Sequence, residues 1–118
     1  MVTVGRHSVT DHRGAERATL EHAVGVTALL ADRTRLAILV ALSGGRERSV
    51  SALASELGRP PAGISQHLAR LRAGCLVTSR RVGTMVLYSA NGKHVELLMV
   101  NVLRHSEHIA CGVPPHHG

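Results

Sequence analysis

Apolar residues recur at helical spacing in the first part of the chain and predict two helices before residue 44. The first begins near Ala15 and gathers its small and aliphatic residues on one side: Leu20, Ala23, Val24, Thr27, Leu30 and Ala31. Asp32 is placed to cap a second helix, Arg33 to Ser43, and the pair Gly44-Gly45 is placed to end it. This second helix is expected to bury Leu36, Leu39, Val40 and Ser43, with Ile38 and Leu42 beside them.

Two further helices are predicted between Ser51 and Gly74. Ser51 can cap a short helix that ends at Gly58 and buries Leu53 and Leu57. Pro61 suits the first position of a longer helix, because its missing N–H is not needed there, and Gly74 suits the end. Ile64, Leu68 and Leu71 fall on one side of this longer helix, opposite Ala62, Gln66, Ala69 and Arg70. One side is therefore expected to pack and the other to stay free.

After residue 76 the pattern changes to that of strands. Runs containing β-branched and aromatic residues at 76–82 and 85–89 flank Gly83-Thr84, which predicts a β-hairpin. A last helix is expected from about Asn91 to Ile109, with a seam that steps by four and three residues: His94, Leu98, Asn101, His105 and His108. The expected fold is mainly α with a β-hairpin wing, with a flexible arm (1–14), a winged helix-turn-helix domain (15–109) and a flexible tail (110–118).

The composition favours a partner that carries phosphates. The 118 residues include 14 Lys plus Arg against eight acidic residues, a net charge of +6, and 13 of those 14 are Arg, the bidentate donor. No apolar run approaches the roughly 20 residues of a membrane span, and the N-terminus lacks the apolar core of a signal peptide. We therefore expect a cytoplasmic protein with no membrane partner. Cys75 and Cys111 are expected to be reduced thiols.

The order of the predicted elements is that of a winged helix-turn-helix. In such a fold the longer helix reads the major groove of double-stranded DNA, and the hairpin contacts the backbone or the minor groove. The residues expected at the DNA are Ser65, Gln66, His67, Arg70, Arg72, Arg80, Arg81 and Thr84. For the longer helix taken alone, the alternative is an ordinary amphipathic helix with a solvated basic face. An enzyme is not expected, because no paired carboxylates or Gly-rich phosphate loop accompany the histidines.

The histidines of the last helix suggest a metal site that two subunits share. His94 and His105 lie on one face but are separated by about 16 Å along the axis, so one helix cannot bring both to one ion. In an antiparallel pair within a homodimer formed through the N- and C-terminal helices, His94 comes opposite His105 and His108 of the other subunit. Three imidazoles suit Ni²⁺, Co²⁺ or Zn²⁺. The alternative is that these are ordinary seam or surface histidines.

Residues 20–108 resemble the ArsR/SmtB family of dimeric winged-helix metal-sensing transcription factors. The resemblance rests on Asp32-Arg-Thr-Arg-Leu-Ala-Ile-Leu39, on Ile64-Ser-Gln-His-Leu-Ala-Arg-Leu71 and on Arg80-Arg-Val-Gly83. Three histidines match the family's C-terminal ligand pattern Asp-x-His-x(10)-His-x(2)-His/Glu, and its ending in His resembles the nickel and cobalt branch: His94, His105 and His108. The resemblance implies a regulator, usually a repressor, whose DNA affinity falls when metal binds. The sequence identifies neither the operator nor the regulated gene.

Three positions depart from the family pattern. Ser49-Val-Ser51 stands where the family's other site has Cys-x-Cys, so arsenic, cadmium or lead sensing is not expected there. Gly92 replaces the Asp ligand, so water, a carbonyl or a further histidine has to complete the shell; the candidates are His7, His12, His116 and His117. Cys75 replaces a glycine, and Gly74 is expected to end the helix instead. The alternative function is a DNA-binding regulator with a degenerate metal site, controlled by another ligand, a redox change or a partner protein.

Overall fold

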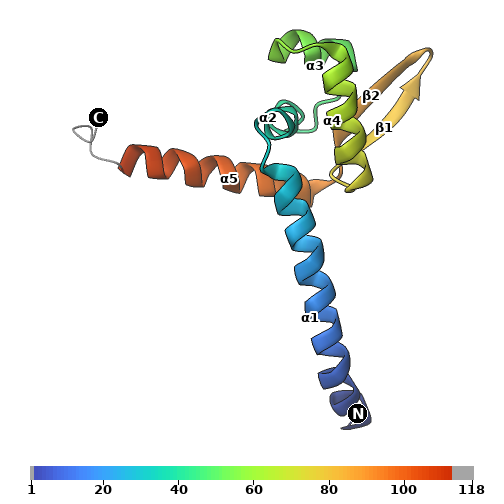
Figure 1. Cartoon of the computed structure of the whole chain (residues 1–118), viewed down its shortest axis with the longest axis vertical. Coiled ribbons are helices and arrows are strands. Elements are labelled where there is room, and N and C mark those ends of the chain that lie inside the picture. Colours follow the sequence, from blue (N-terminus) through green and yellow to red (C-terminus); the bar gives the residue numbers. More distant parts are fainter. Residues whose placement is uncertain (1, 113–118) are drawn as a thin grey trace.

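The computed structural model describes the backbone of residues 2–112 and the side chains of residues 14–107. It contains five helices and one hairpin within that range (Figure 1). In chain order they are α1 (Val2–Leu30), α2 (Arg33–Ala41), α3 (Val50–Leu57), α4 (Pro61–Ala73), β1 (Val77–Val82), β2 (Met85–Ala90) and α5 (Lys93–Gly112). The fold is the expected one, mainly α with a β-hairpin wing.

The two terminal helices are longer than the sequence pattern indicated. The backbone of residues 2–14, the segment that we expected to be a flexible arm, belongs to α1, and α5 continues past Ile109 to Gly112. No proline interrupts either helix, and a glycine within a helix costs only about 1 kcal/mol relative to alanine. A lack of apolar periodicity therefore did not mean a lack of helix.

Side-chain caps fix where α2 and α3 begin. The Asp32 carboxylate accepts the backbone N–H of Arg35 at 2.9 Å, which confirms the predicted N-cap of α2. For α3 the cap is Ser49, whose hydroxyl accepts the N–H of Ala52 at 3.1 Å, so the helix begins two residues earlier than a Ser51 cap would allow. Pro61 is the first residue of α4, as predicted.

The end of α4 differs from the expectation in one respect. Gly74 caps the helix with an ordinary φ of −85°, and the left-handed conformation falls on Cys75, with φ of +62°. The role of Gly74 is a different one, because a Cβ at this position would overlap Leu29 Cδ1 of α1 and displace that side chain. The glycine therefore allows the close approach of α1, and the cysteine carries the backbone strain.

The core lies between α2, α3, α4 and the start of α5. Its fully or nearly buried residues are Ile38, Leu39, Ala41, Leu42, Leu53, Ala54, Ile64, Leu68, Leu71, Leu76, Val77, Val95 and Met99. The predicted stripe of α2 is wrong in part, because Leu36, Val40 and Ser43 are only half-buried while Ile38 and Leu42 are fully buried. The reason is that α3 and α4 pack against the side of α2 that carries Ile38 and Leu42.

The hairpin is held to the body by a short third segment. Val82 pairs with Met85, so the turn is the two residues Gly83-Thr84, and Gly83 has the positive φ of +63° that such a turn requires. At the other end, Arg48 and Tyr88 exchange backbone hydrogen bonds of 3.0 and 2.8 Å. The loop between α2 and α3 therefore fixes the base of the wing.

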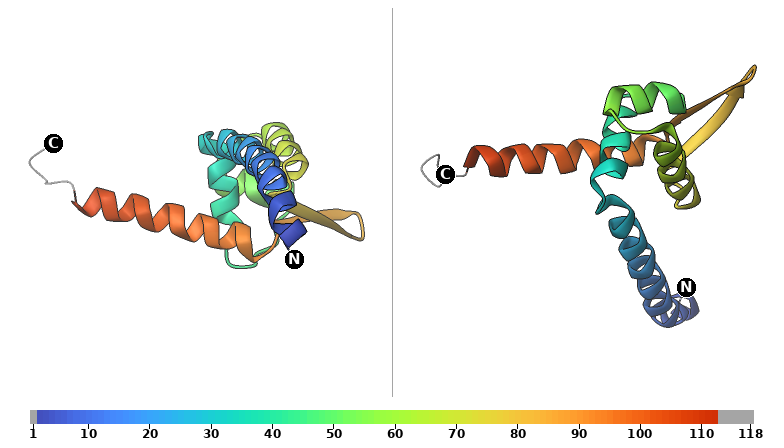
Figure 2. Two further views of the ribbon diagram at one scale, coloured as in Figure 1. Left: turned by 90° about the horizontal axis from the view of Figure 1, so that it is seen from below. Right: turned by 45° about the horizontal axis from the view of Figure 1, so that its top comes forward.

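The outer parts of α1 and α5 extend away from this body. Both helices project from it, and the hairpin leaves on the side opposite α5 (Figures 1 and 2). The radius of gyration is 18.5 Å, whereas a compact chain of this length has about 13.5 Å. Large apolar side chains are exposed on both helices: Leu20, Val24, Leu97, Val100 and Leu103. In the described part of the chain no helix is both long and apolar enough to cross a membrane.

Candidate nucleic-acid interface

The outward face of α4 is polar and free, as the spacing predicted. Ile64, Leu68 and Leu71 are fully buried. The opposite side is exposed, and four of its residues carry hydroxyl, amide or guanidinium groups: Ser65, Gln66, Arg70 and Arg72. Because the only charges there are positive, this face can donate hydrogen bonds to phosphates and to the acceptors on base edges.

His67 is oriented differently from its neighbours on α4. Its side chain is only 26% exposed and turns toward the start of α2. The ring Nδ1 lies 3.5 Å from a guanidinium nitrogen of Arg35 and 3.9 Å from a carboxylate oxygen of Asp32. Sequence spacing places His67 next to Gln66 on the free face, but it carries no information on these partners more than 30 residues away.

The two arginines of the wing have different environments. The Arg80 guanidinium donates two hydrogen bonds to the Glu47 carboxylate, from Nε at 2.5 Å and from the terminal nitrogen at 2.8 Å. This pairing lowers the pKa of Glu47 below its ordinary 4.5 and raises the pKa of Arg80. Arg81 and Thr84 are exposed near the tip. Within the described side chains, Arg81 makes no hydrogen bond or ion pair, so its charge is free.

The three histidines that match the family's ligand pattern lie on α5, away from α4 and the hairpin: His94, His105 and His108. His94 and His105 are both exposed, on one continuous helix. Leu98 is not in their free seam, because it packs against the core beside Val95 and Met99. Among residues 14–107 no group of three His, Cys, Asp or Glu side chains is close enough to hold a metal ion. The side chains of the other predicted ligands lie outside the described residues: His7, His12, His108, His116 and His117.

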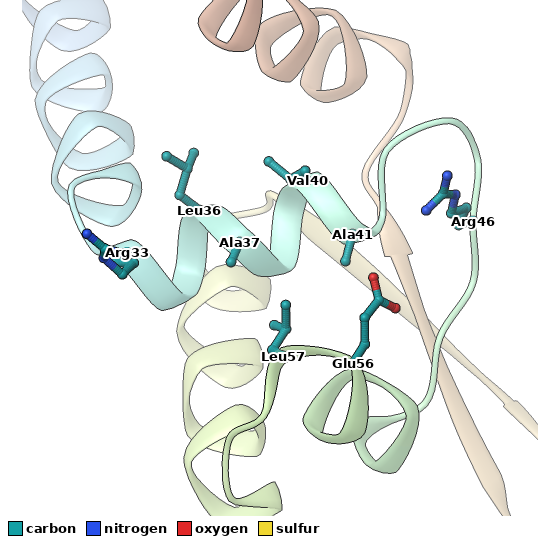
Figure 3. A pocket seen from close by; sticks show the side chains of 8 residues that line it. All are labelled: Arg33, Leu36, Ala37, Val40, Ala41, Arg46, Glu56 and Leu57. Carbon is teal, nitrogen blue, oxygen red and sulfur yellow. The ribbon is translucent and has the colours of Figure 1, made fainter. Parts of the chain in front are cut away.

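A groove of about 550 Å³ lies between α2 and α3 (Figure 3). Its lining is mainly aliphatic, with charged side chains at the rim: Arg33, Leu36, Ala37, Val40, Ala41, Arg46, Glu56 and Leu57. The Glu56 carboxylate is paired with Arg48 at 3.2 Å. None of the predicted DNA or metal ligands lines this groove. Cys75 is a free, exposed thiol, and the side chain of Cys111 lies outside the described residues.

Comparison with known proteins identifies the family. A helix-turn-helix domain model matches residues 30–80. The chain is 43% identical over 94 residues to the HTH-type transcriptional regulator KmtR of Mycobacterium tuberculosis, covering 80% of this chain and 72% of the relative. It is 35% identical to NmtR of the same organism, covering 75% and 72%.

Solved structures agree with this assignment. A homodimeric winged helix-turn-helix DNA-binding domain from Mycobacterium bovis, described as a possible ArsR-family regulator, superposes with a TM-score of 0.72 at 35% identity, covering 78% of this chain and 84% of that one. Reduced HlyU from Vibrio cholerae gives 0.70 at 31% identity, covering 76% and 94%. These relatives are regulators rather than enzymes. The chain therefore belongs to the ArsR/SmtB family of winged helix-turn-helix transcriptional regulators.

Proposed function

We propose that this protein is a homodimer that binds double-stranded operator DNA and changes its DNA affinity when Ni²⁺ or Co²⁺, or in their place Zn²⁺, binds between the α5 helices. The observation that carries the DNA part is the free polar face of α4 next to a basic wing. Ser65, Gln66 and His67 are assigned to base edges, and the arginines of α4 and the wing to phosphates, with Thr84 at the wing tip.

The dimer is supported by the apolar surface that the single chain leaves open. Leu20 and Val24 of α1 are 64% and 59% exposed and stand one helical turn apart. Leu97, Val100 and Leu103 form a similar patch on α5. Burial of aliphatic side chains against a second copy stabilises the dimer by about 25 cal/mol per Å² of apolar surface. A two-fold pair of such chains presents two copies of α4, which is the arrangement that reads two half-sites.

The metal part rests on the donor set and on its accessibility. The imidazoles of His94 and His105 are exposed on the helix that the dimer brings together, and imidazole suits these three metals. We assign each ion to His94 of one subunit with His105 and His108 of the other. A bound ion would accept the imidazole lone pairs of both subunits and so cross-link the two α5 helices. Acidification should weaken binding, because protons compete with the metal for the imidazole nitrogens.

Subunit mixing tests the shared site. Homodimers of His94→Ala and of His105→Ala should each lose tight Ni²⁺ binding in a stoichiometric titration. A mixed dimer with one subunit of each kind should recover one tight site, because both lesions fall on the same shared site and leave the other intact. A site within one chain would be damaged in both subunits, and no tight binding would return.

His22→Ala is the matched control, since His22 is an exposed histidine on α1 that is not assigned to the site. It should bind two ions per dimer like the wild type. If mixed dimers recover nothing, or if His94→Ala leaves the affinity unchanged, the shared site is wrong. The alternative then takes its place: a family regulator with a degenerate metal site, whose control comes from another ligand, a redox change or a partner protein.

A further inference from the structure

The side chain of Arg35 joins three helices. Its Nε donates to the Leu29 carbonyl at 2.8 Å, and one terminal nitrogen lies 3.4 Å from the Ala28 carbonyl. The other terminal nitrogen lies 3.5 Å from Nδ1 of His67. One guanidinium from the first turn of α2 therefore reaches the end of α1 and the middle of α4.

The end of α1 is where a guanidinium is well placed. The last carbonyls of a helix have no partner within the helix and carry the negative end of its dipole, so a cationic donor stabilises them. The backbone N–H of Arg35 donates to the Asp32 carboxylate at 2.9 Å, which fixes this residue in the first turn of α2. That hydrogen bond is the main reason why the pKa of Asp32 lies below its ordinary 3.8, and the positive charge of the Arg35 guanidinium lowers it further.

The same guanidinium selects one form of the His67 ring. Arginine has donors and no acceptor, so a ring nitrogen that hydrogen-bonds to it has to be the acceptor. The Asp32 carboxylate oxygen lies 3.9 Å from the same Nδ1, which is too far for a competing hydrogen bond. In neutral His67 the proton then sits on Nε2, and the ring keeps a donor on the side away from Arg35. A donor in that place suits a phosphate oxygen or a base acceptor such as guanine N7.

The rest of the contact between α4 and α2 has little directionality. Ile64, Leu68 and Leu71 pack through aliphatic surface, which resists separation more than it resists small rotations of the helix. Among residues 14–107, the side-chain polar contacts between α4 and α2 run through His67. This link therefore supplies the directional restraint.

We propose that Arg35 is a positioning residue that ties the DNA-reading helix to the end of α1 and holds His67 in its Nε2–H form. The inference rests on the proposed DNA binding. Because α1 is one of the two helices assigned to the dimer interface, a movement of α1 against the other subunit would shift α4 through this guanidinium.

A double-mutant cycle tests the link. The variants are Arg35→Met, which keeps a long unbranched side chain without donors, His67→Gln, and the pair. The probe is a duplex selected by the wild-type protein from a randomised library, and the readout is fluorescence anisotropy at constant salt. Each single change should weaken binding by about tenfold, within the range for residues in contact, and the double variant should be no weaker than either. Full additivity would overturn the inference.

Three measurements separate this role from a general loss of stability or charge. Arg33→Gln removes the same charge two residues earlier, from an exposed side chain, and should leave affinity nearly unchanged. Arg35→Lys should restore part of the affinity, because one ammonium can reach a carbonyl but cannot span both partners. In the free protein, imidazole ¹⁵N shifts should report unprotonated Nδ1 for His67 and move toward a tautomer mixture in Arg35→Met.

The two proposals can fail separately. A wild-type protein that selects no duplex overturns the DNA-binding function and the positioning role of Arg35 in it, while the imidazole spectrum still shows whether Arg35 holds the ring. A protein that selects a duplex but shows additive mutations, or an unchanged His67 spectrum in Arg35→Met, overturns only the role of Arg35.

Discussion

The unequal environments of the two wing arginines lead to a quantitative prediction about salt. Each phosphate that a protein neutralises contributes about 0.9 to the slope of log K against log salt concentration. Arg81 is free, whereas Arg80 is already held by two hydrogen bonds to Glu47. Arg81→Ala should therefore flatten the slope by about 1.8 per dimer. Arg80→Ala should flatten it by less than half as much.

Removal of the Glu47 carboxylate should change the salt slope in the opposite direction. Glu47→Gln removes the partner of Arg80 and releases this guanidinium for phosphate. The slope should then steepen by up to about 1.8 per dimer. Lowering the salt from 200 to 50 mM should therefore raise the affinity of the variant by roughly tenfold more than it raises that of the wild type. Adding Arg80→Ala to Glu47→Gln should remove this gain.

Anisotropy titrations of one duplex at four or more salt concentrations measure these slopes. Glu56→Gln is the matched control, because it removes another carboxylate that pairs with an arginine, Arg48, outside the hairpin. It changes the net charge equally and should leave the slope nearly unchanged. Equal slopes for Arg80→Ala and Arg81→Ala, with no effect of Glu47→Gln, would refute the idea that Glu47 competes with phosphate for Arg80.

The remaining predictions concern stability, measured by urea unfolding. Leu68→Ala should cost about 2–5 kcal/mol, because Leu68 is fully buried. Gly74→Ala should destabilise by about 1–3 kcal/mol, since its new Cβ displaces Leu29. Cys75→Gly should gain up to about 1 kcal/mol by relieving the left-handed strain, and Cys75→Val should lose stability. Because the pKa of Asp32 is lowered in the folded protein, its contribution to the free energy of unfolding is complete above the ordinary pKa of 3.8 and is lost as the pH falls through the lowered value. Asp32→Asn still caps the helix but does not titrate, so it should make the free energy of unfolding less sensitive to acid.

The sequence predicted the features of the fold that depend only on residues near one another in the chain. The start of α4 at Pro61 and its buried face follow from the geometry of proline and from the 3.6-residue period. The face of α2 could not be chosen in the same way, because residues 36–42 are all apolar and offer no polar side to orient the helix. Only the positions of α3 and α4 decide which of those residues are buried.

The contacts that distinguish His67 and Arg80 from their neighbours are long-range. Arg80 pairs with Glu47 and His67 meets Arg35, over separations of 33 and 32 residues. The sequence shows no carboxylate from residue 59 to 89, which made the wing look uniformly free. The contact between Gly74 and Leu29 of α1 is also long-range, so the sequence did not show that a Cβ at position 74 would overlap this leucine.

The length of α1 has a consequence for the amount of active protein in a cell. Residues 14–25 are all exposed in the single chain, so this part of the helix gains no burial energy from its own fold. Under the proposed pairing, that energy comes from a second copy, and the apparent melting temperature rises with protein concentration. A newly made, unpaired subunit presents a weakly protected helix to proteases. The level of competent regulator therefore depends on the square of subunit concentration at low expression, and synthesis rate becomes a second control on the regulated gene.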